Sequence, residues 1–314
     1  MYVLGFDIGG TKCAVVTAQV DGGNIKLLKK EKCPTDLSIP PEKMIEKLIK
    51  MADSILDGRP DAIGISCGGP LDSKKGIIMS PPNLVGWDNV AIVDILEAHF
   101  GVRPKLQNDA NACALAEWRF GAGECCENMV FLTFGTGLGA GLILGGRLYE
   151  GTNGNAGEVG HIRLAPSGPV GFGKAGSFEG FCSGGGIAQL GYSMALKARE
   201  NGKTPLYFKD GDSLRDISAA KIAEAAQNGD ETAIAVYQTS GRYLGRGLSI
   251  IIDVLNPERI VIGSIFARSG DLLWKYAKKE IDKEALGVSA ACCKVVPAAL
   301  GENIGDYAAI ATAF

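Results

Sequence analysis

Two stretches of the chain share one pattern, and this duplication limits the folds open to it. "VLGFDIGGTKCAVV" at residues 3–16 and "MVFLTFGTGLGAGLIL" at residues 129–144 each place an apolar strand, a turn of glycine and threonine, and a second apolar strand in succession. Apolar runs of this length are typical of buried strands, and glycine permits the turns between them. A repeat of this kind predicts two similar lobes, and the cleft between two lobes is a usual place for a small-molecule site.

The apolar periodicity around both repeats predicts an α/β fold. In the first half it indicates strands and helices in the order βββαβα. The second half also begins with strands and then continues into longer helices. We expect a small N-terminal lobe over residues 1–107 and a large C-terminal lobe over residues 108–301. A C-terminal helix at about residues 302–314 is expected to pack back on the small lobe.

Composition narrows the class of partner. The chain has 314 residues, and its 32 basic and 35 acidic residues give a formal net charge of -3, so no basic field exists for nucleic acid or an anionic membrane. Nine cysteines without a CxxC spacing indicate reduced thiols in the cytoplasm, and the N-terminus lacks the pattern of a secretory signal. We therefore expect a cytoplasmic protein with a small-molecule partner.

The first turn has the chemistry of a phosphate site. Gly9 and Gly10 let backbone N–H groups approach an anion, and Thr11 and Lys12 add donors and positive charge. Asp7 ends the preceding strand, where its carboxylate suits Mg²⁺, a hard cation. The alternative is a plain hairpin turn, which glycines alone would satisfy. The spacing is not that of a Walker A loop.

The second turn shares the glycines and the threonine of the first turn but has no flanking Asp or Lys. Gly135, Thr136 and Gly137 form another candidate backbone cradle, one that could hold a γ-phosphate. Alone this turn is a weak signal. The shared strand–turn–strand context of the two turns makes the pair more specific.

"LQNDANACALAEW" places two polar residues between a strand and a helix. Asn108 and Asp109 follow the strand and begin an Ala-rich helix that is expected to run to about Trp118. Asp and Asn are favoured helix N-caps, which is the structural interpretation of Asp109. The functional interpretation is a carboxylate that is aimed at a substrate hydroxyl and serves as the base in phosphoryl transfer.

Further polar candidates come from two Gly-rich stretches. "NAGEVGHIRL" supplies Glu158 and His161, and "GSFEGF" supplies Glu179. Of the two histidines, His99 lies near the end of a predicted helix and is interpreted as structural. His161 is better placed for a ligand, although a structural role stays open.

Taken together, these motifs resemble those of the ROK family of sugar kinases and repressors, within the actin and hexokinase superfamily. The resemblance rests on DIGGTK, on PPNL at 81–84, on NDANACALAE, on FGTGLGAG and on GEVGH, in that order along the chain. It implies a two-lobed actin-like ATPase fold of duplicated ribonuclease H-like domains. It also implies a homodimer that transfers the γ-phosphoryl group of ATP to a hexose, commonly at the 6-hydroxyl.

The resemblance also assigns roles to residues. It implies that Asp109 is the catalytic base. It implies that sugar hydroxyls are held by Asn83, Asn108, Glu158, His161 and Glu179. It implies that ATP and Mg²⁺ are held by Asp7, Gly9, Gly10, Thr11, Lys12, Gly135, Thr136 and Gly137. "VIGS" at 261–264 resembles the adenosine-side loop and keeps Gly263, but Ser264 stands where a second glycine is usual.

One loop departs from the family pattern. Many members follow the GEVGH motif with CxCGxxGCxE, in which a His and three Cys bind a structural zinc, and here the cysteine positions hold Val170, Phe172 and Ser177. Because His161 and at most one nearby thiol, that of Cys182, remain, a four-ligand zinc site is not expected. We expect this loop, residues 168–180, to be held by apolar packing of Val170, Phe172 and Phe178. Glu179 is then expected to be held less firmly than in the family pattern.

The resemblance leaves the substrate and the class of function open. Glucose is the first choice, and N-acetylmannosamine, allose, fructose or a β-glucoside are alternatives. A sugar-responsive repressor is a second class, but repressors of the family carry an N-terminal helix-turn-helix, and this fold is expected to start at residue 2. A sugar-binding protein without turnover is a third class.

Overall fold

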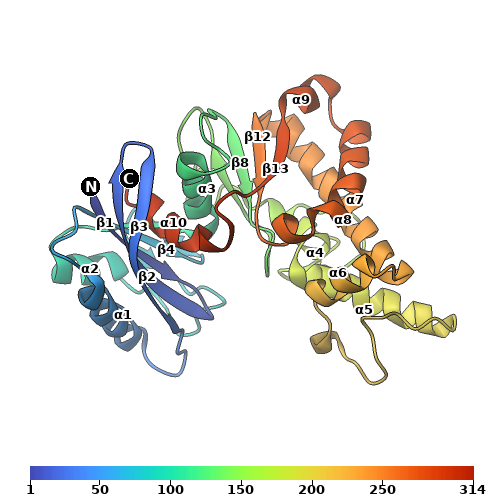
Figure 1. The fold of residues 1–314 in the computed structure, drawn as a ribbon, viewed down its shortest axis with the longest axis horizontal. Helices are drawn as coiled ribbons and strands as arrows, with labels where there is room; N and C mark the ends of the chain where they lie inside the picture. The colour runs from blue at the N-terminus through green and yellow to red at the C-terminus, as the bar shows by residue number, and fades with distance from the viewer. The chain divides into compact units, whose positions relative to one another are not determined.

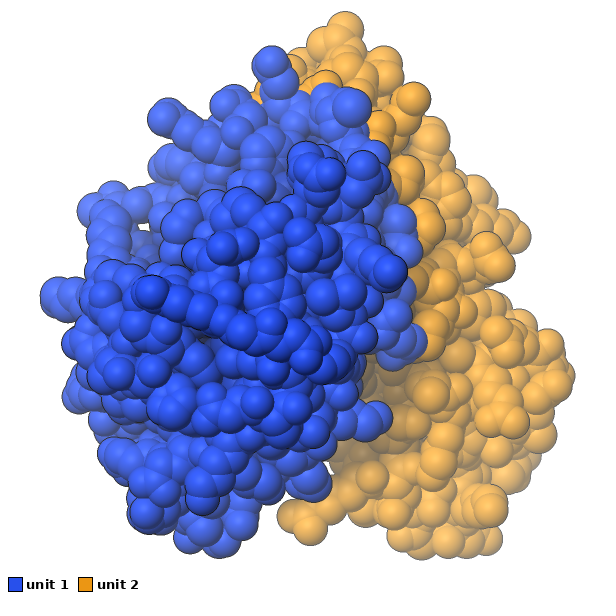
Figure 2. Space-filling model, turned by 60° about the vertical axis from the view of Figure 1, so that its left-hand side comes forward, with its two compact units in different colours: residues 1–127, 141–156, 299–314 blue, residues 128–140, 157–298 orange.

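The computed structural model describes residues 1–314, which divide into two compact units, coloured separately in Figure 2. Unit 1 comprises Met1–Glu127, Gly141–Ala156 and Ala299–Phe314, and unit 2 comprises Asn128–Ala140 and Gly157–Ala298. Unit 1 therefore extends beyond the boundary expected at residue 107. The reason is that the helix after residue 108 packs against the C-terminal helix of the same unit.

Unit 1 is built on a five-stranded sheet of order β3-β2-β1-β4-β7 (Figure 1). The strands are β1 (Tyr2–Ile8), β2 (Lys12–Asp21), β3 (Asn24–Pro34), β4 (Ala62–Cys67) and β7 (Lys105–Asn108), and a small hairpin is formed by β5 (Leu71–Asp72) and β6 (Ile77–Ile78). β1 pairs antiparallel with β2 from Tyr2↔Gln19 to Ile8↔Cys13, and parallel with β4. This register leaves residues 9–11 as the turn of the first hairpin.

Helices cover both faces of this sheet. They are α1 (Pro41–Ile55), α2 (Ile92–Phe100), α3 (Asp109–Phe120) and α10 (Ile304–Ala311), which follows the 3-10 turn η3 (Gly301–Asn303). Leu4 and Phe6 of β1 join the core that contains α1 and α2, whereas Val3 joins the core that contains Ile310 of α10. The alternation of period two along β1 thus has both faces buried.

Glycine lets α10 lie close to the sheet. A Cβ on Gly5 would lie 2.9 Å from the Cβ of Ala309, and a Cβ on Gly64 would lie 2.0 Å from the Ala309 carbonyl oxygen. These two positions on β1 and β4 therefore have to lack a side chain for the helix to pack at this distance. The same helix begins beside the end of β1 that carries Asp7.

Unit 2 combines a parallel sheet with a helical layer. Its strands are β8 (Met129–Leu132), β12 (Arg259–Ile262) and β13 (Lys294–Pro297), with β12 in the middle, and the chain returns to unit 1 through β9 (Ala140–Ile143). A small hairpin is formed by β10 (Val170–Gly171) and β11 (Lys174–Ala175). The helical segments are η1 (Val159–His161), α4 (Phe178–Phe181), α5 (Gly184–Glu200), η2 (Leu214–Asp216), α6 (Ala219–Gln227), α7 (Glu231–Leu255), α8 (Ile265–Glu284) and α9 (Gly287–Cys292).

The long helices of unit 2 pack through small residues. A Cβ on Gly241 of α7 would lie 2.6 Å from the Leu273 carbonyl oxygen of α8, and one on Gly245 would lie 2.4 Å from that of Ala277. Glycines four residues apart on α7 therefore form a flat contact for α8. None of the helices in the structure combines the length and the apolar character needed to cross a membrane.

Candidate functional site

The first Gly-rich turn is closed by backbone hydrogen bonds. The Gly9 N–H donates to the Lys12 carbonyl oxygen at 3.1 Å, and Thr35, just after β3, donates from its hydroxyl to the Gly9 carbonyl oxygen at 2.6 Å. Thr11 and Lys12 remain exposed. The turn is thus fixed from both neighbouring strands, while the side chains of Thr11 and Lys12 face solvent, as an anion site requires.

The loop that carries Asn83 packs directly on this turn. A Cβ on Gly10 would lie 2.3 Å from the Asn83 carbonyl oxygen and 2.7 Å from the Asn83 Cβ. The loop is itself closed, because the Leu84 N–H donates to the Pro81 carbonyl oxygen at 2.9 Å and the Leu84 side chain is buried. Unit 1 therefore brings a predicted sugar contact and the predicted phosphate turn together.

Asp7 lies in an unfavourable environment for a lone charge. Burial and the neighbouring carboxylates of Asp306 and Asp109 raise the pKa of Asp7 to about 6, against the opposing effect of Lys12 and Lys30. A cluster of carboxylates that repel one another is the kind of donor set that a divalent cation stabilises. Asp7 therefore offers an oxygen ligand that suits Mg²⁺, but no three carboxylate, thiol or imidazole groups of the chain are placed to hold a metal, so further ligands would have to come from ATP phosphates and water.

Sequence reasoning missed two charged residues near Asp7, namely Asp306 and Lys30. Asp306 is 3% exposed, and its carboxylate accepts a hydrogen bond from the Lys30 ammonium at 2.6 Å, across 276 residues of sequence. No motif links the two positions. The available signal was an acidic residue inside the otherwise apolar C-terminal helix, because such a residue has to be paired when it is buried.

The raised pKa of Asp7 predicts how stability depends on pH. Because the folded protein holds this proton more tightly than the unfolded chain, Asp7 makes the free energy of unfolding fall as the pH rises from about 4 to about 6. In Mg²⁺-free buffer, Asp7→Asn should raise the unfolding free energy at pH 8 by on the order of 2 kcal/mol. Urea titrations of both proteins at pH 4.5 and pH 8 measure this. A stabilisation that is absent at pH 8, or larger at pH 4.5, would contradict the assignment.

Asn108, rather than Asp109, caps helix α3. The Asn108 side-chain oxygen accepts a hydrogen bond from the Asn111 N–H at 3.1 Å, so the structural role considered for Asp109 belongs to its neighbour. Asp109 is the first helical residue, and one of its carboxylate oxygens accepts from the Ala110 N–H at 2.9 Å. Its carboxylate is accessible to solvent, but the protein packed around it removes enough hydration to raise its pKa. Asp109 is thus available for chemistry in a way that a capping residue is not.

The second Gly-rich turn belongs to unit 2 and packs beside Gly263 and Ser264. The Gly135 N–H donates to the Gly137 carbonyl oxygen at 3.1 Å, and the Gly263 N–H donates to that of Leu132 at 3.0 Å. A Cβ on Gly135 would lie 3.6 Å from the Ser264 hydroxyl. Ser264 has φ 50° and ψ -109°, a backbone conformation that favours glycine, so the serine is held there at the cost of strain.

Glu179 is held by one hydrogen bond and by close packing. Its carboxylate accepts a hydrogen bond from the Leu138 N–H at 3.0 Å. A Cβ on Gly137 would lie 2.9 Å from the Glu179 carboxylate, and a Cβ on Gly171 would lie 2.8 Å from the Glu179 Cβ. Close packing of glycines on Glu179 thus fixes it against the second turn without any metal.

The expected packing of the 168–180 loop is wrong at two positions. Phe178 is fully buried, but Val170 is 47% exposed and Phe172 is 73% exposed, because both belong to the β10–β11 hairpin at the surface. Hydrogen bonds hold this hairpin instead. The Gln189 amide donates to the Val170 carbonyl oxygen and accepts from the Val170 N–H, each at 2.9 Å.

His161 and Glu158 lie on the same short segment of unit 2. Glu158 directly precedes η1 and is exposed, whereas His161 ends η1 and is half-buried. The His161 ring contacts the Phe172 ring edge-on at 5.5 Å between centroids, and the Lys174 ammonium donates to the His161 carbonyl oxygen at 2.7 Å. The structure thus groups Glu158, His161 and Glu179 in unit 2, and Asn83, Asn108 and Asp109 in unit 1.

The donors near His161 do not suit a structural zinc. The Cys182 thiol is fully buried, donates to the Ser240 carbonyl oxygen at 3.5 Å, and has a pKa raised by burial, so it is held as a protonated thiol. The Ser177 hydroxyl is used to cap α4. A structural zinc needs four ligands, which are thiolates or free imidazoles. Here only the imidazole of His161 remains.

We therefore predict a protein without stoichiometric zinc. Elemental analysis of protein purified without chelator should find well under one zinc per chain, and EDTA should leave the melting temperature unchanged, because hydrogen bonds hold the hairpin. One zinc per chain, released by EDTA with a fall in melting temperature, would show that other residues complete a site.

Proteins similar to this chain include glucokinases of the ROK family. A model of the ROK family matches residues 3–313. The glucokinase of Halalkalibacterium halodurans is 31% identical over 312 residues, 97% of this chain and 92% of that protein. The ROK family glucokinase of Streptomyces griseus, solved in complex with glucose and AMPPNP, is 30% identical with a TM-score of 0.79, and the match covers 100% of this chain and 99% of that chain.

Regulators are similar to the chain as well. The DNA-binding transcriptional dual regulator NagC of Escherichia coli is 31% identical over 252 residues, which are 79% of this chain and 60% of that protein. The expected α/β fold of the two-lobed actin-like ATPases is confirmed by the family match and by the solved glucokinase. The fold is shared by kinases and regulators, so function has to be argued from the site.

Proposed function

Because the chain belongs to the ROK family, we propose that it is a sugar kinase, which transfers the γ-phosphoryl group of ATP to a hexose. The observation that carries this proposal is Asp109, whose carboxylate is accessible, has a raised pKa, and is released from capping by Asn108. A carboxylate with these properties suits a general base better than a structural cap. The glucokinases among the relatives support glucose as the substrate. The 6-hydroxyl is the accepting group that we propose.

The two Gly-rich turns are proposed to hold the nucleotide. The Gly10 N–H and the side chains of Thr11 and Lys12 would bind phosphate oxygens, Gly9 would shape the turn through its own hydrogen bond to Lys12, and Asp7 would hold Mg²⁺. The N–H groups of Thr136 and Gly137 would add a second backbone cradle, which Gly135 closes through its hydrogen bond to Gly137. Gly263 would lie on the adenosine side. When bound, Mg²⁺ supplies positive charge that offsets the charge on the transferring group.

The sugar would be held by side chains from several loops. Asn83, Asn108, Glu158, His161 and Glu179 are proposed to bind its hydroxyls, and Glu179 is held against the second turn by its hydrogen bond from the Leu138 N–H. Asp109 would orient the accepting hydroxyl and take its proton as the phosphoryl group is transferred. Catalysis would then be mainly positioning and electrostatic stabilisation.

There are two alternatives, one for the substrate and one for the class of function. The substrate can be another sugar, such as N-acetylmannosamine, allose, fructose or a β-glucoside, because specificity depends on small shifts of hydrogen-bonding groups. A regulator that binds sugar without turnover is supported by the similarity to NagC. The retained Asp109 and both turns favour the kinase.

The nine free cysteines favour a cytoplasmic location, and a homodimer remains the expected assembly.

A panel assay tests the proposed function. ADP formation is measured with each of these sugars at equal concentration, and we expect turnover above the no-sugar rate, fastest with glucose. Fastest turnover with another sugar would correct the substrate and keep the kinase. Saturable sugar binding by calorimetry without ADP formation from any sugar would favour the regulator.

Metal dependence gives a separate prediction. Turnover should vanish in EDTA and return when Mg²⁺ alone is added in excess, because ATP phosphates and Asp7 need a hard cation between them. The melting temperature in EDTA is the control, since it should not change. Turnover that persists in metal-free buffer would contradict the phosphoryl-transfer mechanism.

A further inference from the structure

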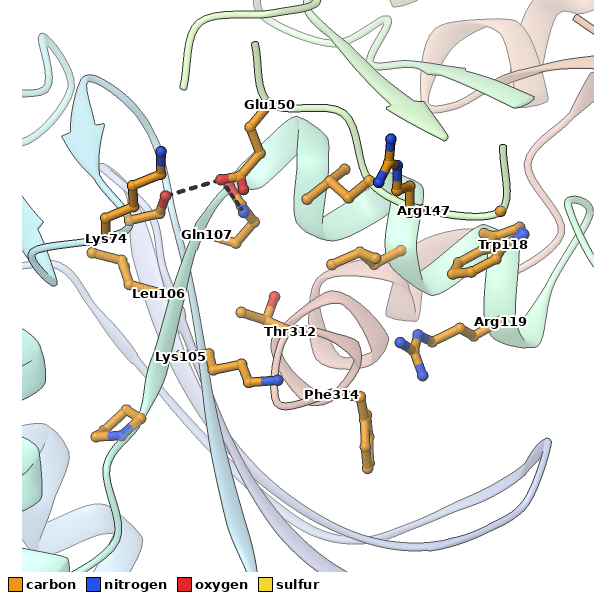
Figure 3. A pocket seen from close by; sticks show the side chains of 15 residues that line it. Lys74, Lys105, Leu106, Gln107, Trp118, Arg119, Arg147, Glu150, Thr312 and Phe314 are labelled. Atoms are coloured by element: carbon orange, nitrogen blue, oxygen red, sulfur yellow. Dashed lines mark hydrogen bonds between the residues drawn. The ribbon is translucent and has the colours of Figure 1, made fainter. Parts of the chain in front are cut away.

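Unit 1 contains a cavity that none of the proposed substrate residues lines. It has a volume of about 450 Å³ and lies beside β7, the edge strand of the sheet (Figure 3). Its lining comes from the β5–β6 hairpin, β7, α3, the segment after β9 and the C-terminus. A cavity of this size and mixed lining is suited to a small molecule.

The charges around this cavity are unbalanced. Lys74, Lys105, Arg119 and Arg147 line it, against the single carboxylate of Glu150. That carboxylate already accepts hydrogen bonds from the Ser73 hydroxyl at 2.9 Å and the Gln107 amide at 3.0 Å, which Figure 3 marks as dashed lines. None of the four cationic side chains forms an ion pair in the structure. The cavity therefore has an excess of positive charge and no internal partner for it.

Arg119 carries the strongest sign of a missing partner. Its Nε is buried and has no hydrogen-bond acceptor. The guanidinium lies 5.6 Å from the Trp118 ring and 5.4 Å from the Phe314 ring, and burial lowers its pKa. Aromatic faces offset only part of the cost of desolvating a guanidinium. An anion in the cavity would offset the remaining cost through its charge, without having to reach the buried Nε.

Part of the remaining lining is apolar. Leu106, Leu115, Leu148 and the two aromatic rings share the cavity with the cations, and Figure 3 shows Trp118, Arg119 and Phe314 grouped on one side of it. A bare inorganic anion would leave this surface uncovered. A ligand with an anionic head and a small organic body would satisfy both kinds of group.

We propose that this cavity binds a small phosphate monoester, with the phosphoryl group among the four cations and the organic body against the leucines and the aromatic rings. Arginine and lysine together favour a phosphate dianion, because the guanidinium can bind two of its oxygens at once. The site is separate from the turn of residues 9–12, so it goes beyond the proposed kinase activity.

Phenyl phosphate is the probe for this proposal, titrated calorimetrically into the full chain. The double variant Lys105→Met with Arg147→Met keeps the fold, because both side chains are exposed, and should bind at least about tenfold more weakly. The matched control is Lys47→Met with Lys50→Met, two exposed lysines of α1 outside the cavity, which should bind like the unchanged protein. Inorganic phosphate should bind more weakly than phenyl phosphate, and phenol should not bind.

The proposed nucleotide turn needs its own control. Lys12→Met removes the cation of that turn and should leave binding of phenyl phosphate within about twofold, since Lys12 does not line the cavity. Loss of binding in Lys12→Met, together with normal binding in the Lys105 and Arg147 variant, would place the ligand at the turn and overturn the proposal. Absence of saturable binding to the unchanged protein would overturn it as well.

Discussion

Asp109→Asn should lower kcat by about a thousandfold, while the dissociation constant of the sugar changes by less than about tenfold. The amide keeps the size and the hydrogen-bonding groups of the side chain but cannot take the proton of the accepting hydroxyl. Asn108 continues to cap α3, so the helix should begin at the same residue in the variant. Steady-state ADP formation and calorimetric binding of glucose give the two quantities.

A second Asp-to-Asn variant is the control for this result. Asp94→Asn changes an exposed carboxylate on α2, whose hydrogen-bond partner is Arg103, and should leave kcat unchanged. Near-normal kcat in Asp109→Asn would remove Asp109 from the chemistry. A large loss of glucose affinity with little change in kcat would make it a binding residue instead.

Gly10→Ala should raise KM for both substrates and lower kcat/KM by about a hundredfold. The new Cβ would lie 2.3 Å from the backbone oxygen of Asn83, so either the turn or the Asn83 loop has to move. One side of that contact is proposed to bind phosphate and the other the sugar. A single methyl group is therefore expected to disturb both, which separate kinetics with varied ATP and varied glucose would detect.

Gly23→Ala is the control for the substitution itself. Gly23 lies in the turn between β2 and β3, and a Cβ there meets nothing within 4 Å. Its kinetics should match those of the unchanged protein. If Gly10→Ala left both KM values unchanged, the close packing of turn and loop would have no part in substrate binding.

The parts of the fold that sequence predicts well are those with local causes. The apolar alternation in β1 and β2, interrupted by Gly9 and Gly10, gives the first hairpin directly. Helix α3 was expected to begin at Asn108 and Asp109 and to run to about Trp118, and it occurs at Asp109–Phe120. The Gly-rich turns and Asn108–Asp109 were located by short motifs in a recognisable order.

The parts that sequence does not predict depend on distant residues. Lys30 and Asp306 pair across the chain, and the cavity beside β7 draws its lining from segments between Ser73 and Phe314, so no local pattern encodes either. The hairpin at Val170 and Phe172 was misjudged for a related reason. Apolar residues there suggested packing, but hydrogen bonds to Gln189 hold the loop, and such bonds leave no periodic signal.

Transfer of labelled phosphate tests the central claim most directly. The protein is incubated with glucose, Mg²⁺ and ATP labelled in the γ-phosphoryl group, and the products are separated. We predict that the label enters glucose 6-phosphate with one ADP formed per label transferred, and that Asp109→Asn suppresses this transfer by about a thousandfold. Label found only in ATP and inorganic phosphate, with glucose and with every alternative sugar, would contradict a sugar kinase.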